Sequence, residues 1–388
     1  MNELTPYTLR QLVVYFLKLG TIGFGGPVAL VGYMHRDLVE RRKWISEDEY
    51  KEGLALAQLA PGPLAAQLGI YIGFVHYRVV GATLVGLAFV LPSFIMVVLL
   101  GIAYKLYGGL PLMQSIFYGV GAAVVGIIFI STYKLTIKSI GAISLQSFKE
   151  KWMLWIFFTT AMILTYITEN ENVFLFIAAG ILYMLFKSPP RISIRKGANS
   201  IILLQVGLGE WDNPILLKIA LFFLKAGAFV LGSGLAIVPF LHSGVVAENR
   251  WLTENQFVDA VAVAMVTPGP VVITVGFIGY LIAGFPGASV AALATFLPCY
   301  FFTIIPAPFF KKINKNQSIK AFVEGITAAV IGALAGAVIV IALRSIKDIP
   351  TLLIAVFSFL SLLYIKKIQE PYVILIAAIL GIIIKELV

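Results

Sequence analysis

Long apolar stretches separated by short polar or basic segments dominate the pattern of this chain. The stretches at 79–105 and 112–134 each exceed the roughly 20 apolar residues that a helix needs to cross a hydrocarbon layer of ~30 Å. Stretches of similar length recur at 288–310 and 321–343. This pattern predicts an all-α integral membrane protein whose long helices span the bilayer.

The composition supports that prediction. Hydrophobic residues make up 60% of the chain and charged residues 12%, whereas a soluble globular chain carries about 25% charged residues. The net charge of +10 comes from basic clusters between the apolar stretches. Cytoplasmic loops show this distribution, so the charge does not indicate nucleic acid. Cys299 is the only cysteine, which excludes an internal disulfide framework and a thiolate metal cluster.

An internal repeat organises the chain. A shift of 207 residues aligns Lys18 with Lys225, and the Pro-Gly-Pro triplet at 61–63 with that at 268–270, without a gap. A one-residue adjustment extends the match through both halves. Chance similarity between apolar helices would not keep lysine and Pro-Gly-Pro in one register. We therefore interpret the chain as a duplication.

The repeat predicts two homologous modules, at 1–187 and 215–388, joined by a basic linker at 188–214 that contains proline and glycine. Each module is expected to contain an apolar helix, a basic amphipathic loop, a segment broken by Pro-Gly-Pro, two long apolar helices and two short ones. In chain order, the helices and broken segments are expected at 8–24, 50–76, 79–105, 112–134, 152–168 and 172–187, and at 216–240, 257–283, 288–310, 321–343, 351–365 and 372–387.

The broken segments decide the predicted topology, because each could cross the membrane as a kinked helix or turn back as a re-entrant hairpin. A crossing would put the lysine-rich loop at 134–151 opposite the basic cluster at 36–43, whereas a hairpin keeps both on the cytoplasmic side. The positive-inside rule favours the hairpin. Five crossings per module then invert the second module, a plan that recurs in secondary transporters. The prediction is about ten crossings, two re-entrant hairpins and both termini outside.

Glycine and proline interrupt two apolar segments in each module, at 23–27 and 61–63 and at the matching positions 230–234 and 268–270. Broken backbone at membrane depth is tolerated only where it is buried in protein or lines a cavity. The start of a half-helix offers free N–H donors and about half a positive charge, which suits an anion. Four repeat-matched breaks predict an oxyanion site near the midplane, although one break alone would indicate a kink or a tight helix crossing.

The predicted binding residues are the breaks themselves and the hydroxyl, amide and ammonium side chains near them. They are Lys18, Gly25, Gly26, Pro27, Gln58, Pro61, Gly62, Pro63, Gln67, Lys225, Gly232, Ser233, Gly234, Thr267, Pro268, Gly269, Pro270 and Thr274. The two lysines lie inside the first helix of each module, so they are candidate anion partners, with snorkelling to an interface as the alternative.

Other charged residues have weaker functional interpretations. Arg36, Arg41 and Arg42 could funnel anions from the cytoplasm or form a solvated face. Candidates for proton coupling, with ordinary interfacial roles as the alternative, are Glu52, Asp259, His35 and His242.

Motifs for catalysis and ATP hydrolysis are missing from the sequence: it has no HExxH, paired zinc ligands, Walker loop or GxSxG. A membrane enzyme acting on a lipid head group would need such a cluster, so we expect neither an enzyme nor a cofactor or metal. Transport would then depend on an ion gradient, on exchange or on a partner's energy. A passive anion channel on the same scaffold is the alternative.

The motifs, in this order and spacing, resemble the chromate ion transporter (CHR) family in its long-chain, two-domain form. The resemblance covers nearly the whole chain and is carried by GFGGP at 23–27, ERRKWI at 40–45, QLAPGPLAAQLGIYIGF at 58–74 and NRWLTENQFVDAVAVAMVTPGP at 249–270. It implies an inverted-repeat exporter of chromate in the cytoplasmic (inner) membrane. Sulfate or another tetrahedral oxyanion is the alternative substrate. The implied partners are this anion and the bilayer, with a homodimer left open.

Overall fold

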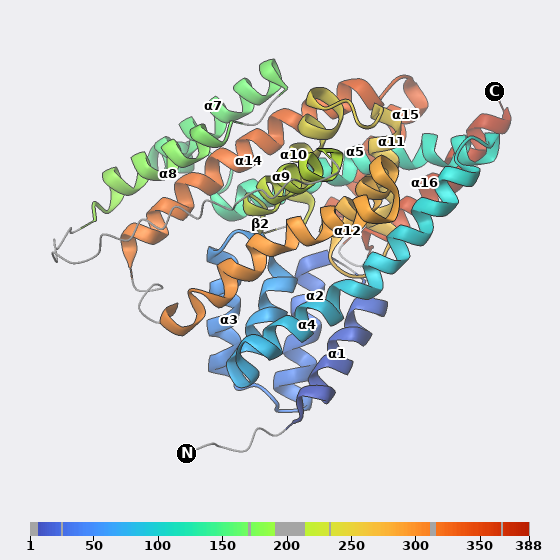
Figure 1. Ribbon diagram of the computed structural model, residues 1–388. Helices are drawn as coiled ribbons and strands as arrows, with labels where there is room; N and C mark the ends of the chain where they lie inside the picture. The colour runs from blue at the N-terminus through green and yellow to red at the C-terminus, as the bar shows by residue number, and fades with distance from the viewer. Residues whose placement is uncertain are drawn as a thin grey trace.

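The computed structural model describes residues 7–24, 26–169, 172–190, 214–232, 234–310, 316–365 and 368–387 (Figure 1). Within these residues the regular secondary structure is helical apart from two strands of two residues each. The predicted all-α class is therefore confirmed.

The described residues of the first half form eight α-helices. Hydrogen-bonded capping boxes begin α1 at Thr8 and α3 at Ser46, where each side chain caps the residue three positions on. The elements are α1 (Leu9–Ile22), α2 (Gly26–Met34), a π-helical segment (His35–Arg41), α3 (Glu47–Leu59), β1 (Gly62–Pro63), α4 (Leu64–Tyr107), α5 (Pro111–Ser139), α6 (Leu145–Glu150), α7 (Trp152–Thr168) and α8 (Val173–Lys187).

The second half repeats the series. Thr253 caps α11 with a capping box at the position that matches Ser46 in the repeat. The elements are α9 (Pro214–Ala228), β2 (Leu231–Gly232), a 3-10 turn (Gly234–Ile237), α10 (Val238–His242), a π-helical segment (Ser243–Glu248), α11 (Glu254–Val266), a 3-10 turn (Val271–Ile273), α12 (Thr274–Ile304), a 3-10 turn (Ala307–Phe309), α14 (Gln317–Ser345), α15 (Ile349–Tyr364) and α16 (Glu370–Leu387).

Some predicted boundaries are wrong. The helix expected at 216–240 ends at Ala228, because the next residues leave the helix to form β2. The basic cluster after α2 was expected as a loop, but much of it continues as a π-helical segment to Arg41. Similarly, Lys134 and Lys138 do not begin a loop, because α5 extends to Ser139.

The second arm of each broken segment runs directly into the long helix that follows. A sharp corner at Arg78, with φ 53° and ψ −144°, joins the two parts of α4. The corner brings Gly73 against Gly81 so closely that a Cβ on Gly81 would lie 2.2 Å from the Gly73 carbonyl oxygen. In α12 the same corner falls at Ala283 and Gly284. The backbones can approach this closely only because glycine has no side chain.

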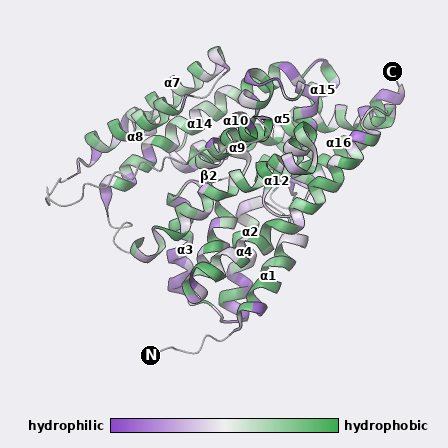
Figure 2. Ribbon diagram, in the orientation of Figure 1, coloured by the Kyte–Doolittle hydropathy of each residue, from purple (hydrophilic) through white to green (hydrophobic). Residues whose placement is uncertain are grey.

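In the described part of the chain, four helices are long and apolar enough to cross a membrane: α4, α5, the segment Val271–Phe309 and α14. Shorter apolar helices are α7, α8 and α15. Large apolar side chains stay exposed along the long helices, among them Leu99, Leu293 and Leu343, and the ribbon in Figure 2 shows that hydrophobic residues dominate these helices. A water-facing surface would not be so apolar. The chain is therefore a multi-pass membrane protein.

The two halves interlock. In Figure 1, α7 and α8 of the first half lie along α14 of the second half, and in return α15 and α16 pack against α5. Small residues at matching positions allow this packing: Gly126 of α5 meets the Ala355 carbonyl, and Gly332 of α14 meets the Phe158 carbonyl. The long helices α5 and α14 are thus each completed by short helices from the other half.

Candidate functional site

The four predicted breaks meet in pairs, each pair joining the two halves. The N–H of Gly62 donates to the Val230 carbonyl at 2.5 Å, and the N–H of Gly269 donates to the Gly23 carbonyl at 2.9 Å. Strands β1 and β2 also pair in parallel, with Gly62 opposite Leu231. The breaks that the repeat predicted to converge therefore lie side by side.

Backbone conformation requires glycine at both centres of the Pro-Gly-Pro triplets. Gly62 has φ 144° and Gly269 has φ 97°, values that residues with a side chain rarely adopt. Space is also lacking, because a Cβ on Gly62 would lie 2.7 Å from the side chain of Gln67, and one on Gly269 would lie 2.0 Å from the Ser93 hydroxyl. Any larger residue would push the paired breaks apart.

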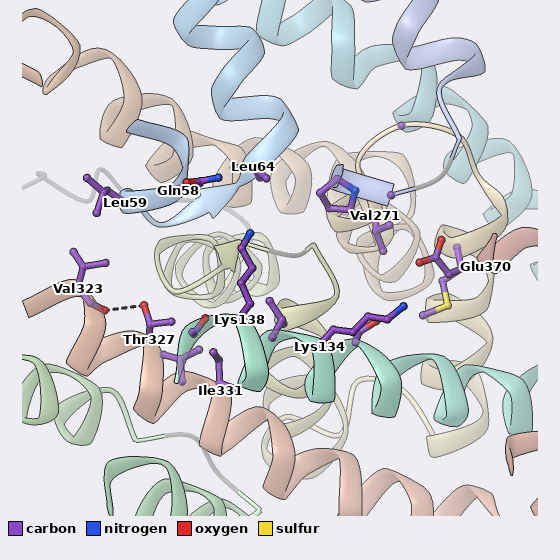
Figure 3. Close-up of a pocket in the computed structure, with 18 of the residues that line it drawn as sticks. Gln58, Leu59, Leu64, Lys134, Lys138, Val271, Val323, Thr327, Ile331 and Glu370 are labelled. Atoms are coloured by element: carbon purple, nitrogen blue, oxygen red, sulfur yellow. Dashed lines mark hydrogen bonds between the residues drawn. The ribbon is translucent and has the colours of Figure 1, made fainter. Parts of the chain in front are cut away.

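A cavity of about 760 Å³ lies beside the paired breaks (Figure 3). One wall contains the ends of α3 and α11, the start of α2 and the first residues after each triplet. Among the predicted binding residues, those that line this cavity are Gly26, Pro27, Gln58, Thr267 and Gly269. The cavity thus brings the first break of the first half, and residues that flank its Pro-Gly-Pro triplet, together with the triplet of the second half.

The opposite wall comes from α5, α14 and the start of α16, and it is charged. It contains three lysines and two glutamates, namely Lys134, Lys138, Lys320, Glu324 and Glu370. None of these was predicted as a binding residue. The signal that could have identified two of them is spacing, since Lys134 and Lys138 lie four residues apart on an apolar helix and so share one face.

The charges on this wall are unevenly paired. Lys187, outside the cavity lining, binds Glu324 at 2.6 Å, which neutralises that glutamate. The ammonium group of Lys134 donates to the Leu362 carbonyl at 3.2 Å. Among the described residues, no carboxylate lies within ion-pair distance of Lys138. The cavity therefore carries an excess of positive charge, which suits an anion.

Several predicted binding residues lie next to the breaks without lining the cavity. Gln67 is fully buried and donates to the Pro61 carbonyl at 2.8 Å, and its side-chain oxygen is the one buried side-chain polar atom without a partner in the described part of the chain. Thr274 is also buried and donates to the Val271 carbonyl. Gly232 belongs to β2 and Gly234 begins the 3-10 turn after it.

The remaining members of the predicted set have simpler placements. Pro61, Pro63, Pro268 and Pro270 flank the two triplet glycines and are not part of the cavity lining. Gly25 and Ser233 lie outside the described residues.

Lys18 and Lys225 do not reach the cavity. Both side chains are exposed on α1 and α9, and the ammonium group of Lys225 lies 5.7 Å from the centre of the Phe240 ring. The two matching lysines lie on the faces of their helices that stay exposed, whereas neighbours such as Phe16 and Phe223 are buried. This placement favours the snorkelling alternative.

The three arginines of the predicted funnel have different surroundings. Arg36 lines a second pocket of about 590 Å³ that shares Gly23 and Phe24 with the main cavity. Arg36 pairs with Asp37 at 3.5 Å, and Arg41 pairs with the same carboxylate at 3.6 Å. The guanidinium of Arg42 lies instead over aromatic rings, including Trp44 at 4.6 Å, so its face is engaged by cation–π contact.

Two of the four proton-coupling candidates, His35 and His242, each contact a glutamate, and these contacts lie at matching positions of the repeat. His35 contacts Glu47 at 2.9 Å, and His242 contacts Glu254 at 2.7 Å. Of the other two candidates, Glu52 is half-buried.

Asp259 is buried, with an exposed fraction of 6%, and among the four candidates only His242 is more buried. The hydroxyl of Tyr104, on α4 in the other half, donates to its carboxylate at 2.7 Å. The buried carboxylate thus has a polar partner across the boundary between the halves.

The comparisons agree with the two-part organisation. A sequence model described as "Chromate transporter" matches residues 10–185 and 217–382. The chain is 61% identical over 383 residues to the chromate transport protein of Cupriavidus metallidurans, covering 97% of this chain and 93% of that protein. It is 57% identical over 384 residues to a probable chromate transport protein of Synechococcus elongatus, covering 97% and 96%.

A more distant relative is an uncharacterized transporter of Methanocaldococcus jannaschii, 30% identical over 387 residues, with 96% of this chain and 93% of that protein covered. No solved structure matches the chain. The two segments matched by the family fall on the two halves that the internal repeat defines.

Proposed function

The chain belongs to the chromate transporter family, and on this premise we propose that it is a secondary transporter that exports chromate across the cytoplasmic membrane. The substrate proposal is supported by similarity over nearly the whole chain to proteins named for chromate transport. Sulfate has the same tetrahedral shape and charge, so it is the related anion that the same donors would bind.

The observation that carries the proposal is the cavity of about 760 Å³ at the paired breaks, with its excess of lysine. A tetrahedral dianion would be held there between the broken backbone and the cationic wall. Gln58 would add a side-chain amide donor from the end of α3, whereas the Thr267 hydroxyl at the end of α11 donates to the Val263 carbonyl at 2.7 Å. The helix starts after the two triplets contribute positive potential near the same place.

The proposed topology has two modules, 1–187 and 215–388 with the linker 188–214, in inverted orientation. It comprises about ten crossings and two re-entrant hairpins at the triplets. In support, α3 and α11 have 13 residues each, so each is roughly 20 Å long and too short to cross a bilayer alone. The reciprocal pairing of the breaks is what a two-fold relation between modules would produce.

The proposed energy source is a proton gradient, with Asp259 as the coupling group. Its burial and its hydrogen bond to Tyr104 favour it over Glu52, which is less enclosed. An intramembrane carboxylate near a substrate path is a common proton relay in transporters. His35 and His242 hold carboxylates of their own, which favours a structural role for both.

The test is anion transport by the purified protein in liposomes. Chromate, sulfate and chloride are compared with and without an imposed pH gradient. Saturable chromate movement that sulfate inhibits and the gradient drives uphill is the expected result. Flux that only runs downhill would indicate a channel or uniporter instead. No movement of any of the three anions would contradict the proposed substrate.

A further inference from the structure

We propose that Lys138 is the side chain that binds the oxyanion in the cavity, and that it supplies the positive charge which selects a dianion. This inference rests on the proposed function and identifies the cation of that site. Its support comes from the internal repeat, from the pairing of charges and from the direction of the lysine side chains.

Lys138 and Arg344 occupy equivalent positions. They are related by 206 residues, the same offset that relates Gly126 to Gly332. Each lies in the last turns of a 29-residue helix, α5 or α14. Both halves therefore place one cation at the same point of the module.

Arg344 is neutralised by two carboxylates. One of its guanidinium nitrogens binds Glu254 at the start of α11 and another binds Glu169 after α7. His242 holds the second oxygen of Glu254 at 2.7 Å. This cation thus has a complete set of protein partners and no need of a ligand.

Lys138 lacks the equivalent partner. The residue matching Glu254 is Glu47, which binds His35 and Lys51 instead, at 2.9 Å and 3.2 Å. Among the described residues no carboxylate takes its place beside Lys138. The equivalent cation of the first half is therefore uncompensated and opens onto the cavity.

The two lysines of α5 point in different directions. Figure 3 shows Lys134 directed along the cavity toward Glu370, and its ammonium group is also bound by the Leu362 carbonyl. Lys138 is directed instead across the cavity toward Gln58 and Leu64, at the first broken segment. Lys138 is thus the lysine that faces the breaks, with an amide donor on the opposite wall.

An oxyanion between these walls would receive a charge-assisted hydrogen bond from Lys138 and a neutral one from Gln58. Hydrogen bonds to ionised groups are about twice as strong as neutral ones. A dianion gains more from the uncompensated ammonium group than a monoanion does, because the interaction energy scales with charge. The arrangement accordingly favours sulfate and chromate over chloride.

The first experiment measures binding of radiolabelled sulfate to the purified full-length protein in lipid nanodiscs. We expect Lys138→Gln to weaken sulfate affinity by roughly tenfold or more, and Lys138→Arg to keep it within about threefold because the charge remains. Lys149→Gln removes the same charge from an exposed position outside the cavity and should bind like the wild type.

A chemical rescue separates lost charge from lost folding. In Lys138→Cys, an aminoethyl methanethiosulfonate reagent forms a disulfide with the new thiol, releases sulfinate and restores a primary amine near the original length. Cys299, the only native cysteine, is buried and should not react. Sulfate is the probe here because chromate oxidises thiols. Recovery of binding with this reagent, but not with its anionic sulfonate analogue, would support the role of charge.

The outcomes are distinguishable. Unchanged sulfate affinity in Lys138→Gln, in a protein whose wild type binds sulfate and moves chromate, would overturn the role of Lys138 alone. Failure of both methanethiosulfonate reagents to restore binding would likewise reject a charge-based role. A wild type that neither binds sulfate nor transports chromate would reject the proposed function, and this inference with it.

Discussion

The backbone N–H of Gly269 donates a hydrogen bond of 2.9 Å to the carbonyl oxygen of Gly23. The bond joins the Pro-Gly-Pro triplet of the second half to the end of the first helix in the first half. The reciprocal bond, from Gly62 to Val230, does the same in the other direction. Neither half alone could form the pair of contacts, so the candidate site depends on both.

Replacing Gly269 or Gly62 with valine should abolish transport without preventing membrane insertion. A β-branched residue at these positive φ values costs of order 1–3 kcal/mol in strain, and its Cβ would clash with Ser93 or Gln67. Liposome uptake measures the loss, and the amount of protein in the membrane fraction reports insertion.

Gly32→Val is the matched control, because a Cβ at Gly32 meets nothing within 4 Å. It should transport like the wild type. Normal chromate uptake by Gly269→Val and Gly62→Val would show that the paired breaks are not required for transport.

Substituting Arg36 with glutamine should raise the apparent KM for chromate by about threefold and reduce its dependence on ionic strength, because steering by an exposed charge is screened by salt. The maximal rate should stay the same. Initial rates at low and high salt provide the measurement. Arg41→Gln removes an exposed cation that also pairs with Asp37 but lines neither pocket, so it should change the KM less. Equal effects of the two substitutions would argue against a specific role for Arg36.

Asp259→Asn should uncouple transport from the proton gradient. The amide keeps the size of the carboxylate and a possible bond to Tyr104 but cannot bind and release a proton. Downhill exchange of sulfate should continue, whereas uphill accumulation driven by the pH gradient should disappear. Asp48→Asn, at an exposed residue in the first turn of α3, serves as the control. Retained uphill accumulation in Asp259→Asn would assign coupling to another group.

Arg344→Met should lower the stability of the protein by about 1 kcal/mol, the upper end of the range for partly exposed ion pairs. The substitution leaves Glu254 and Glu169 without their shared cation, although both carboxylates retain some access to solvent. Thermal unfolding in detergent measures the effect as a lower Tm. Lys51→Met removes a more exposed pair with Glu47 and should leave the Tm nearly unchanged. A similar Tm for both variants would contradict a stabilising role for Arg344.

Much of the fold could be predicted from local features of the chain. Helix length and apolar content identify the membrane class, and the repeated triplets around Gly62 and Gly269 locate the breaks, because glycine and proline change backbone conformation whatever surrounds them. Internal repetition also placed equivalent elements at equivalent positions, down to the capping residues Ser46 and Thr253. These features depend on a few neighbouring residues, so they can be recognised in the sequence alone.

The direction in which each helix faces could not be predicted in this way. In a membrane helix both the lipid-facing and the protein-facing sides are apolar, so periodicity does not reveal which side is buried. Lys18 and Lys138 are both exposed, but the sequence pattern predicts Lys18 at the site and Lys138 in a loop, whereas Lys138 lines the cavity and Lys18 does not. For the same reason, the sequence does not predict that α7 and α8 of the first half pack against α14 of the second half. Only packing of the two halves against each other sets these rotations, and with them the chemistry of the cavity.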